Sequence, residues 1–282
     1  SLAAAEHRES MAAALPPYEW LMPLAPWESP EALAVVLASL AAQSWPARCL
    51  VVSVDGVLPP PLRRVLEQSG LPLRILEAPS WQGTGAVLAR GLAGCSADWV
   101  LRADADDCSH PQRAERQLRY VQAHPDVVVL GAQLAEAAGG ASRRRVRHVP
   151  INDREIRALM RWRNPLNHPT VALRRQAVLA FGNYRPCPGF EDWDLWLRLA
   201  AHGSTFANLP DELVTAAVGE AHLARRRGGR YLQQEARFLM RCGCEGLLPL
   251  PHVLLLMALR LPWRLLPPGC LAALMAWLRS AR

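Results

Sequence analysis

The chain has 282 residues, of which 51% are hydrophobic, enough to bury the core of one large α/β domain. The formal net charge is +7, yet all 32 basic residues are arginine, which indicates a compositional bias, and we expect no nucleic-acid partner. Seven cysteines, none in a CxxC pair, exclude a complete disulfide framework and favour a reducing, cytoplasmic setting. Charges at Glu6, Arg8 and Glu9 interrupt the Ala-rich start, so no secretion signal is expected.

In the first half, helical patterns alternate with apolar extended segments, which predicts a mostly parallel sheet with crossover helices. The predicted helices span residues 31–43, 62–68, 85–91 and 111–123. The strands that follow them span residues 50–54, 73–76, 99–102 and 127–130. A first strand is expected at 20–25, although Pro23 interrupts it and proline cannot donate to a sheet ladder. The carboxyl ends of the strands should carry the site.

The second half is predicted to be α-rich and to supply the other wall of a cleft. After a Gly/Arg loop at 139–147, helices are expected at 153–162, 174–181 and 190–202.

The last stretch, 247–282, contains an apolar run at 253–259 that is shorter than the roughly 20 residues a bilayer core requires. Arg260, Arg264 and Trp277 alternate with its apolar residues, as in an interfacial helix. A pair of helices packed on the domain is the alternative, and both interpretations stay open.

The sharpest local feature is the segment 99–108, in which a strand runs into three carboxylates. Residues two apart on an extended chain point the same way, so Asp104 and Asp106 are expected to converge on one cation while Asp107 faces elsewhere. Oxygen ligands of this kind suit Mg²⁺ or Mn²⁺, which also bind phosphate oxygens. Without a cation the carboxylates would repel one another, so a metal site is the favoured interpretation.

Two alternatives compete with the metal site. The acids could belong to a turn that caps the helix beginning near Pro111, with Ser109 as the N-cap. An aspartyl nucleophile of the phosphatase type is disfavoured, because Cys108 stands where a threonine would be expected.

A second acidic cluster, Glu191, Asp192 and Asp194, opens the predicted helix 190–202. Acids at a helix N-terminus are favoured by the exposed N–H groups, so simple capping explains them. The constrained loop that precedes them could instead hold one carboxylate at a cleft mouth, ready to take a proton from an acceptor hydroxyl. The pattern alone does not decide between the two.

Three further features are ambiguous by themselves. Asp55 follows the strand 50–54, where a carboxylate can hydrogen-bond a nucleotide base or ribose, but an ordinary turn Asp looks the same. The run Arg225 to Gly229 suits closure over a diphosphate, against the alternative of a solvated basic loop. His168 lies among turn residues, and a lone histidine is more often structural than a ligand.

Together, the order of these elements resembles the family-2 glycosyltransferases of the GT-A fold, in particular the bacterial exopolysaccharide and O-antigen branch typified by the amylovoran and colanic-acid enzymes. Each matching segment is modest evidence, and their joint order and spacing is strong evidence. The matching segments are residues 39–46, 54–56, 102–107, 111–117, 164–170, 182–185, 191–198 and 226–229.

The resemblance implies a GT-A domain at 16–220, with a nucleotide-binding half at about 16–135 and an acceptor-binding half at about 136–220, followed by an Arg/Gly loop and a membrane-associating helical segment at 221–282. It implies roles by position. Asp55 would contact the base, Asp104 the ribose or metal, Asp106 the metal (Mn²⁺ or Mg²⁺), and Arg226 and Arg227 the diphosphate; Asp192 would be the base that gives inversion. Glu191, His168 and Asp107 are secondary candidates.

The implied activity is transfer of one residue from a nucleoside-diphosphate sugar to a polyprenyl-diphosphate-linked saccharide, at the inner face of the bacterial plasma membrane. The Gln-x-x-Arg-Trp motif of processive synthases is absent from the sequence, so single transfer is expected. Ala86 and Ala89 replace the basic residue and asparagine common near the nucleotide, and Pro23 alters the first strand. These departures leave a non-catalytic nucleotide-sugar-binding or scaffold subunit as the alternative.

Overall fold

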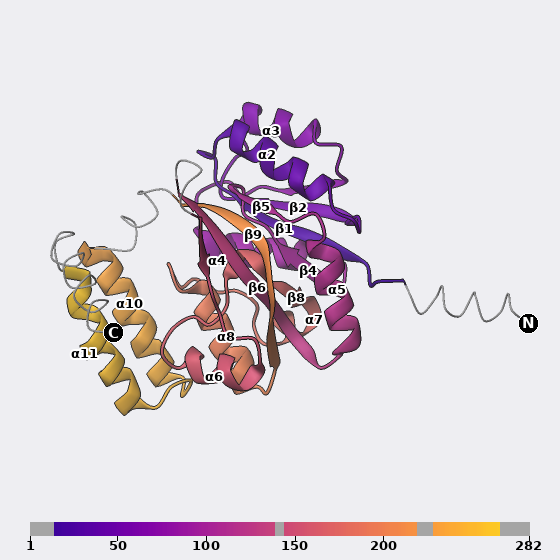
Figure 1. Ribbon diagram of the computed structural model, residues 1–282. Coiled ribbons are helices and arrows are strands. Elements are labelled where there is room, and N and C mark those ends of the chain that lie inside the picture. Colours follow the sequence, from indigo (N-terminus) through magenta and orange to yellow (C-terminus); the bar gives the residue numbers. More distant parts are fainter. Residues whose placement is uncertain (1–13, 139–143, 219–227, 266–282) are drawn as a thin grey trace, which may run out of the picture.

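The computed structural model describes residues 14–138, 144–218 and 228–265. Figure 1 shows a twisted sheet with helices on both faces and a helical pair at one edge of the molecule. The first half of the chain contains β1 (Tyr18–Leu24), α2 (Pro30–Ala41), β2 (Cys49–Val54), α3 (Pro60–Glu67), β3 (Leu73–Leu76), α4 (Thr84–Gly94), β4 (Trp99–Arg102), β5 (Asp107–Ser109), α5 (Arg113–Ala123) and β6 (Val127–Ala138). The predicted helices and strands of this half are therefore confirmed, and only the short β5 is additional.

The second half departs further from the prediction. It contains β7 (Arg144–Arg147), α6 (Asp153–Met160), the 3-10 turn η1 (His168–Thr170), β8 (Ala172–Arg174), α7 (Arg175–Ala180), α8 (Glu191–Ala201), β9 (Thr205–Val218), α10 (Gly228–Cys244) and α11 (Leu250–Leu265). The expected helix at 174–181 is correct only from Arg175 onward, because residues 172–174 pair in the sheet. The 14-residue strand β9 is missing from the sequence prediction.

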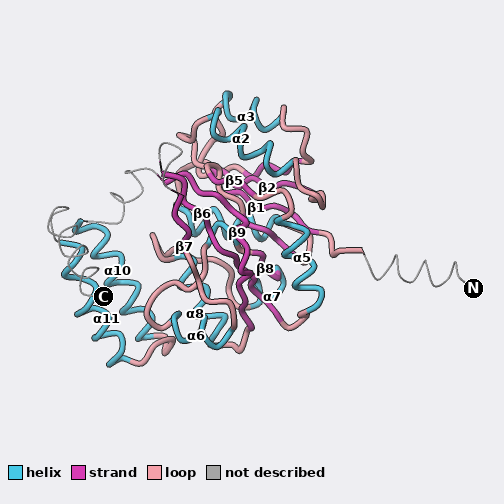
Figure 2. Tube along the Cα trace, in the orientation of Figure 1, coloured by secondary structure: helices cyan, strands magenta, loops and turns pink. Residues whose placement is uncertain are grey.

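One continuous sheet has the order β3-β2-β1-β4-β8-β6-β9-β5, with β7 paired to β6. The strands β3, β2, β1 and β4 of the first half are parallel. β8 is antiparallel to both of its neighbours, and β7 and β5 are also antiparallel to theirs. β6 and β9, the two longest strands, pair in parallel. The expected α/β architecture, a sheet flanked by helices, is therefore confirmed, and the sheet is mixed because β8, β7 and β5 run antiparallel (Figure 2).

Alternate residues along the central strands fill two separate cores. Trp20, Met22 and Leu24 of β1 pack with α2, α3 and α5 on one face, whereas Leu21 faces α4 and α8 on the other. β2 and β4 follow the same period of two, as a pleated strand requires. The parallel strands are thus covered on both faces, and their carboxyl ends open at one edge of the sheet.

Pro23 fits inside β1 without loss of a ladder hydrogen bond. The carbonyl of Leu21 accepts from Ala103 on the β4 side, so alternation places the missing N–H of Pro23 on that same side. The β1–β4 pairing ends at Leu21 and Arg102, two residues before Pro23. A proline is therefore tolerated in this central strand.

The helices α10 and α11 pack against each other and join the core through Phe238, Leu239, Val253 and Leu256. None of the helices in the described part of the chain is both long enough and apolar enough to cross a membrane.

Candidate functional site

The acidic segment forms a turn at the carboxyl end of β4. Ala105 and Asp106 occupy the turn, and the N–H of Asp107 donates to the carbonyl of Asp104 at 3.5 Å. The carboxylates of Asp104, Asp106 and Asp107 each offer an oxygen, and these oxygens lie within 4.8 Å of one another. The expectation that Asp107 faces elsewhere is wrong, because the chain bends here instead of staying extended.

Arg102, the last residue of β4, holds Asp104 in place. Its guanidinium contacts the two carboxylate oxygens at 2.6 and 2.8 Å. Burial lowers the pKa of Arg102, but the charge and hydrogen bond of Asp104 act together with Tyr184 and Asp107 to hold that pKa above its usual value. A permanent cation is thus fixed beneath the acidic turn, while Asp106 is the most exposed of the three acids.

Three converging carboxylates are hard oxygen donors, the ligand type that Mg²⁺ and Mn²⁺ prefer. Within residues 14–138, 144–218 and 228–265, no other group of three His, Cys, Asp or Glu side chains converges in this way. The donor set therefore fits a divalent cation.

Arg113 anchors both ends of the acidic turn from below. Its buried guanidinium donates to the carbonyl of Arg102 at 2.7 Å, to Ser109 Oγ at 3.0 Å and to Gln117 Oε1 at 3.1 Å. Burial lowers its pKa to about 9. Arg113 carries no motif of its own in the sequence, and its i, i+4 spacing from Gln117 on one helix face is the signal that points to it.

In the second acidic cluster, at the start of α8, Asp194 and Asp192 have different environments. Asp194 is fully buried and accepts from Arg185 at 2.7 and 2.8 Å and from Arg198 at 3.0 Å, so it is structural. Asp192 stays partly exposed, accepts the N–H of Trp193 at 2.7 Å, and is also bonded by the amide of Asn164. Asp192 is the acid of this pair that remains accessible.

His168 and Tyr184 connect the two acidic centres. His168 Nδ1 lies 3.8 Å from Asp192 Oδ2, and Nε2 lies 2.9 Å from the Tyr184 hydroxyl. Burial, and then the charge of Arg102, hold the pKa of His168 well below its usual value, so its ring is neutral. Burial raises the pKa of Tyr184, and both Asp192 and Asp104 raise it further. Asp192, His168 and Tyr184 are therefore linked by contacts, and the charges of Asp192 and Asp104 both reach the Tyr184 hydroxyl.

Glu191 lies beside this group, against the N-terminus of α4. Burial, together with the charge of Asp192, raises its pKa to about 7. A Cβ added to Gly85 would lie 3.2 Å from the Glu191 side chain and 2.5 Å from the Arg185 carbonyl. Only glycine at position 85 allows the loop before α8 to approach α4 so closely.

Asp55 lies at the carboxyl end of β2, at the same edge of the sheet. Its carboxylate accepts the N–H of Gln82 at 2.6 Å and that of Gly83 at 3.1 Å, which fixes the loop that leads into α4. The predicted contact with a base stays a prediction. Arg226 and Arg227 lie outside the described residues.

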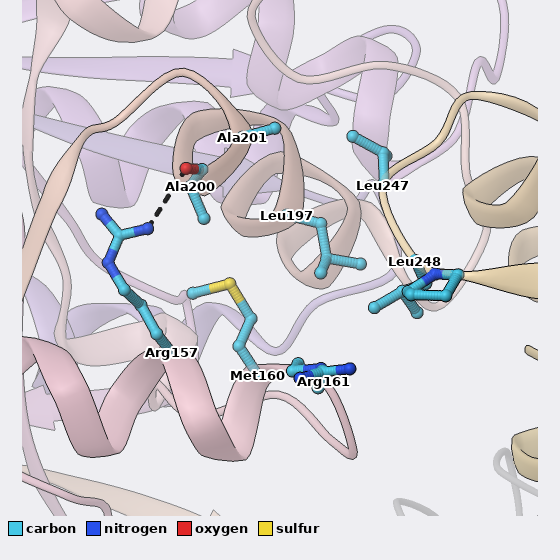
Figure 3. A pocket seen from close by; sticks show the side chains of 9 residues that line it. Arg157, Met160, Arg161, Leu197, Ala200, Ala201, Leu247 and Leu248 are labelled. Atoms are coloured by element: carbon cyan, nitrogen blue, oxygen red, sulfur yellow. Dashed lines mark hydrogen bonds between the residues drawn. The ribbon is translucent and has the colours of Figure 1, made fainter. Parts of the chain in front are cut away.

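A separate cavity has a volume of about 230 Å³ (Figure 3). It is bounded by α6, the C-terminal half of α8 and residues 247–249, whereas Asp192 lies in the first turn of α8. The Arg157 guanidinium beside it is already engaged by Asp153 and by the carbonyls of Ala200 and Ser204. The cavity contains none of the acids described above.

Residues 27–181 match the sequence profile of the family described as Glycosyl transferase family 2. An uncharacterized glycosyltransferase of Haemophilus influenzae is 38% identical over 260 residues, covering 90% of this chain and 96% of that protein. The amylovoran biosynthesis glycosyltransferase AmsE of Erwinia amylovora is 34% identical over 74% of this chain and 79% of its own length.

An Escherichia coli protein named UDP-Gal:alpha-D-GlcNAc-diphosphoundecaprenol beta-1,3-galactosyltransferase is 27% identical over 79% of this chain and 82% of its own length. The fold is shared with the mannosyltransferase PcManGT from Pyrobaculum calidifontis, solved with GDP-Man and Mn²⁺, at a TM-score of 0.64 and 17% identity. That alignment covers 96% of this chain and 77% of the mannosyltransferase. By its sequence profile and its relatives, the chain is a glycosyltransferase and belongs to glycosyl transferase family 2.

Proposed function

We propose that this glycosyltransferase is metal-dependent and inverting, and that it moves one sugar from a nucleoside-diphosphate sugar to a lipid-linked saccharide. The observation that carries the proposal is the group of carboxylates at the end of β4, whose oxygens lie within 4.8 Å of one another, together with the partly exposed Asp192 of α8 beside the His168–Tyr184 pair. One carboxylate group suits a cation and the other suits a proton acceptor.

The acidic turn would hold the donor diphosphate through Mn²⁺ or Mg²⁺. Asp106 would be the principal ligand because it is the most exposed of the three acids, and Asp104, fixed by Arg102, would reach the metal or the ribose. Asp107 completes the set. The bound cation would neutralise the negative charge that develops on the departing nucleoside diphosphate. Arg226 and Arg227 are proposed to assist at the diphosphate, and Asp55 at the base.

Asp192 would take the proton from the acceptor hydroxyl. Its carboxylate is oriented by the Trp193 N–H and by the Asn164 amide. The neutral ring of His168 nearby does not neutralise it. A base on the face opposite the leaving group gives in-line attack and hence inversion.

The acceptor class follows from the relatives. The E. coli relative is named for a UDP-galactose donor and a diphosphoundecaprenol-linked acceptor, and AmsE for amylovoran biosynthesis. We therefore propose a UDP-sugar donor and a polyprenyl-diphosphate-linked acceptor in bacterial surface polysaccharide synthesis. The protein would then work as a peripheral protein at the cytoplasmic membrane face, with its C-terminal helices on the lipid.

The test is to titrate UDP- and GDP-sugars by calorimetry in the presence and absence of Mn²⁺. Asp106→Asn should lose the metal-dependent part of donor binding, whereas Asp192→Asn should bind donor normally and lose transfer by about 10²–10⁴-fold. Asp211→Asn, at a half-exposed position away from the site, is the control. Unchanged donor affinity in Asp106→Asn would remove the metal assignment, and donor binding without turnover in the wild type would favour the scaffold alternative.

A further inference from the structure

The outward face of α11 is apolar throughout. The exposed residues of its described part lie on about half of the helix circumference, at the i, i+3 and i+4 spacings of one face. They are Leu250, Pro251, Leu254, Leu255, Ala258, Leu259 and Pro262. The four leucines remain between 44% and 56% exposed. A helix that faces water normally places charged residues there, so this face is built for an apolar environment.

The loop 161–163 is fastened to the same helix. His252 of α11 bonds to the carbonyl of Arg161 at 2.8 Å and packs edge-on against Trp162. Arg260 bonds to the carbonyl of Trp162 at 3.1 Å. His252 borders the apolar face on the helix surface, so the half-exposed Trp162 lies at its margin.

The loop 161–163, at the margin of the apolar face of α11, is positively charged. Arg161 and Arg163 are exposed on either side of Trp162, and neither forms an ion pair with the described part of the chain. The only two acids between residues 228 and 282 are Glu235, paired to Arg260 at 2.7 Å, and Glu245, paired to Arg185 at 2.5 Å. The same stretch contains seven arginines. An apolar face bordered by tryptophan and arginine matches an anionic lipid surface in both polarity and charge.

The loop 161–163 is followed directly by a residue that contacts the proposed base. Asn164 follows Arg163 directly, and its side chain bonds to the carboxylate of Asp192. A lipid surface against Trp162 would thus lie next to the proposed base.

We propose that the α11 face and the loop 161–163 form one docking surface for an anionic bilayer, which brings a lipid-linked acceptor to Asp192. The proposal rests on the lipid-linked acceptor class proposed above. Figure 1 shows α10 and α11 at the outer edge of the molecule, so a flat surface can approach α11 without contacting α2 or α3.

The test is co-sedimentation of the full chain with vesicles of phosphatidylcholine alone or of phosphatidylcholine and phosphatidylglycerol, without donor or acceptor. Replacement of Leu254 and Leu259 by serine should weaken binding to mixed vesicles by about tenfold for each leucine. Arg161→Gln and Arg163→Gln should each weaken binding to the anionic vesicles by about fivefold at low salt, with little change on phosphatidylcholine. Transfer to a water-soluble acceptor analogue should persist in all four variants.

The matched controls are Val35→Ser, a 61% exposed position on α2, and Arg48→Gln, an exposed arginine before β2. Both should bind vesicles like the wild type. Wild-type binding by the leucine variants overturns the proposal, and so does a change in their oligomeric state, measured by light scattering, without a change in vesicle binding. If the wild type binds vesicles through this surface but transfers no sugar, the docking surface stands and the proposed function fails.

Discussion

At the scale of single residues, the burial of Glu191 makes folding depend on pH. Its pKa rises from 4.5 to about 7 in the folded protein. Between these values the unfolded chain releases this proton while the folded chain keeps it, so stability falls as pH rises and levels off above pH 7. The loss amounts to about 3 kcal/mol.

Glu191→Gln should therefore be equal in stability to the wild type near pH 4 and more stable by about 3 kcal/mol near pH 8. The measurement is urea unfolding of the metal-free protein across this range. Glu155→Gln, at an exposed position of α6, is the control and should show no such trend. A difference independent of pH would contradict the raised pKa.

The spacing of acidic residues in the sequence was enough to predict the candidate site carboxylates. It was not enough to predict the residues that position those carboxylates through side-chain contacts. Asp104, Asp106 and Asp192 were found because carboxylates stand out at strand and helix ends. Tyr184 was missed because its partner His168 lies on another element, and Arg102 was missed because an arginine at a strand end is common and its contact with Asp104 forms only when the chain turns there. The position of Asp107 was mispredicted because a local turn cannot be told from an extended end by alternation alone.

At the scale of elements, α8 depends on a buried ion cluster. Asp194 is fully buried between Arg185 and Arg198. Asp194→Ala would leave the Arg198 guanidinium without its carboxylate and Arg185 with Glu245 alone, and should cost about 3–5 kcal/mol of unfolding free energy. Asp211→Ala breaks the half-exposed pair with Arg116 and should cost less than about 1 kcal/mol. Similar losses in both variants, measured by urea unfolding, would refute a structural role for Asp194.

The contact between α4 and the loop before α8 depends on the missing side chain of Gly85. An added methyl group would meet the backbone carbonyl of Arg185 at 2.5 Å, which cannot move like a flexible side chain. Gly85→Ala should lower stability by about 1–3 kcal/mol and reduce transfer, because Glu191 moves with the loop.

Gly243→Ala in α10 is the matched control, since its nearest neighbour would lie at 3.4 Å. It should be neutral or stabilising by up to about 1 kcal/mol, as expected of alanine in a helix interior. Thermal unfolding and a transfer assay would show both effects, and a fully active Gly85→Ala would contradict the close packing.

The helices and strands of the first half were predictable because the hydrophobic periodicity and the turn residues of the sequence indicate the same boundaries there. β9 was missed because Pro210 and Asp211 interrupt its pattern, and the structure absorbs them as an irregularity between the pairs Ala132–Leu209 and Gln133–Glu212. A bulge is defined by the pairing with a partner strand, and the local periodicity of one segment carries no information on that pairing.

At the scale of the whole molecule, one sheet runs through both the first half of the chain, 16–135, and the second, 136–220. The face lined by Trp20 and the face lined by Trp196 share the strands β1, β2 and β4. We therefore expect a single unfolding transition in urea, with coincident far-ultraviolet circular dichroism and tryptophan fluorescence. Two separated transitions would show that the halves fold independently.

The two longest strands end together. Ala138 of β6 pairs with Val218 of β9, and the segments 139–143 and 219–227 begin immediately after these residues. Their starting points are set by one register, so a change of length in either strand end would displace the origin of both segments. Chimeras that borrow either segment from a relative should consequently exchange both segments as a unit, together with the strand ends that bear them.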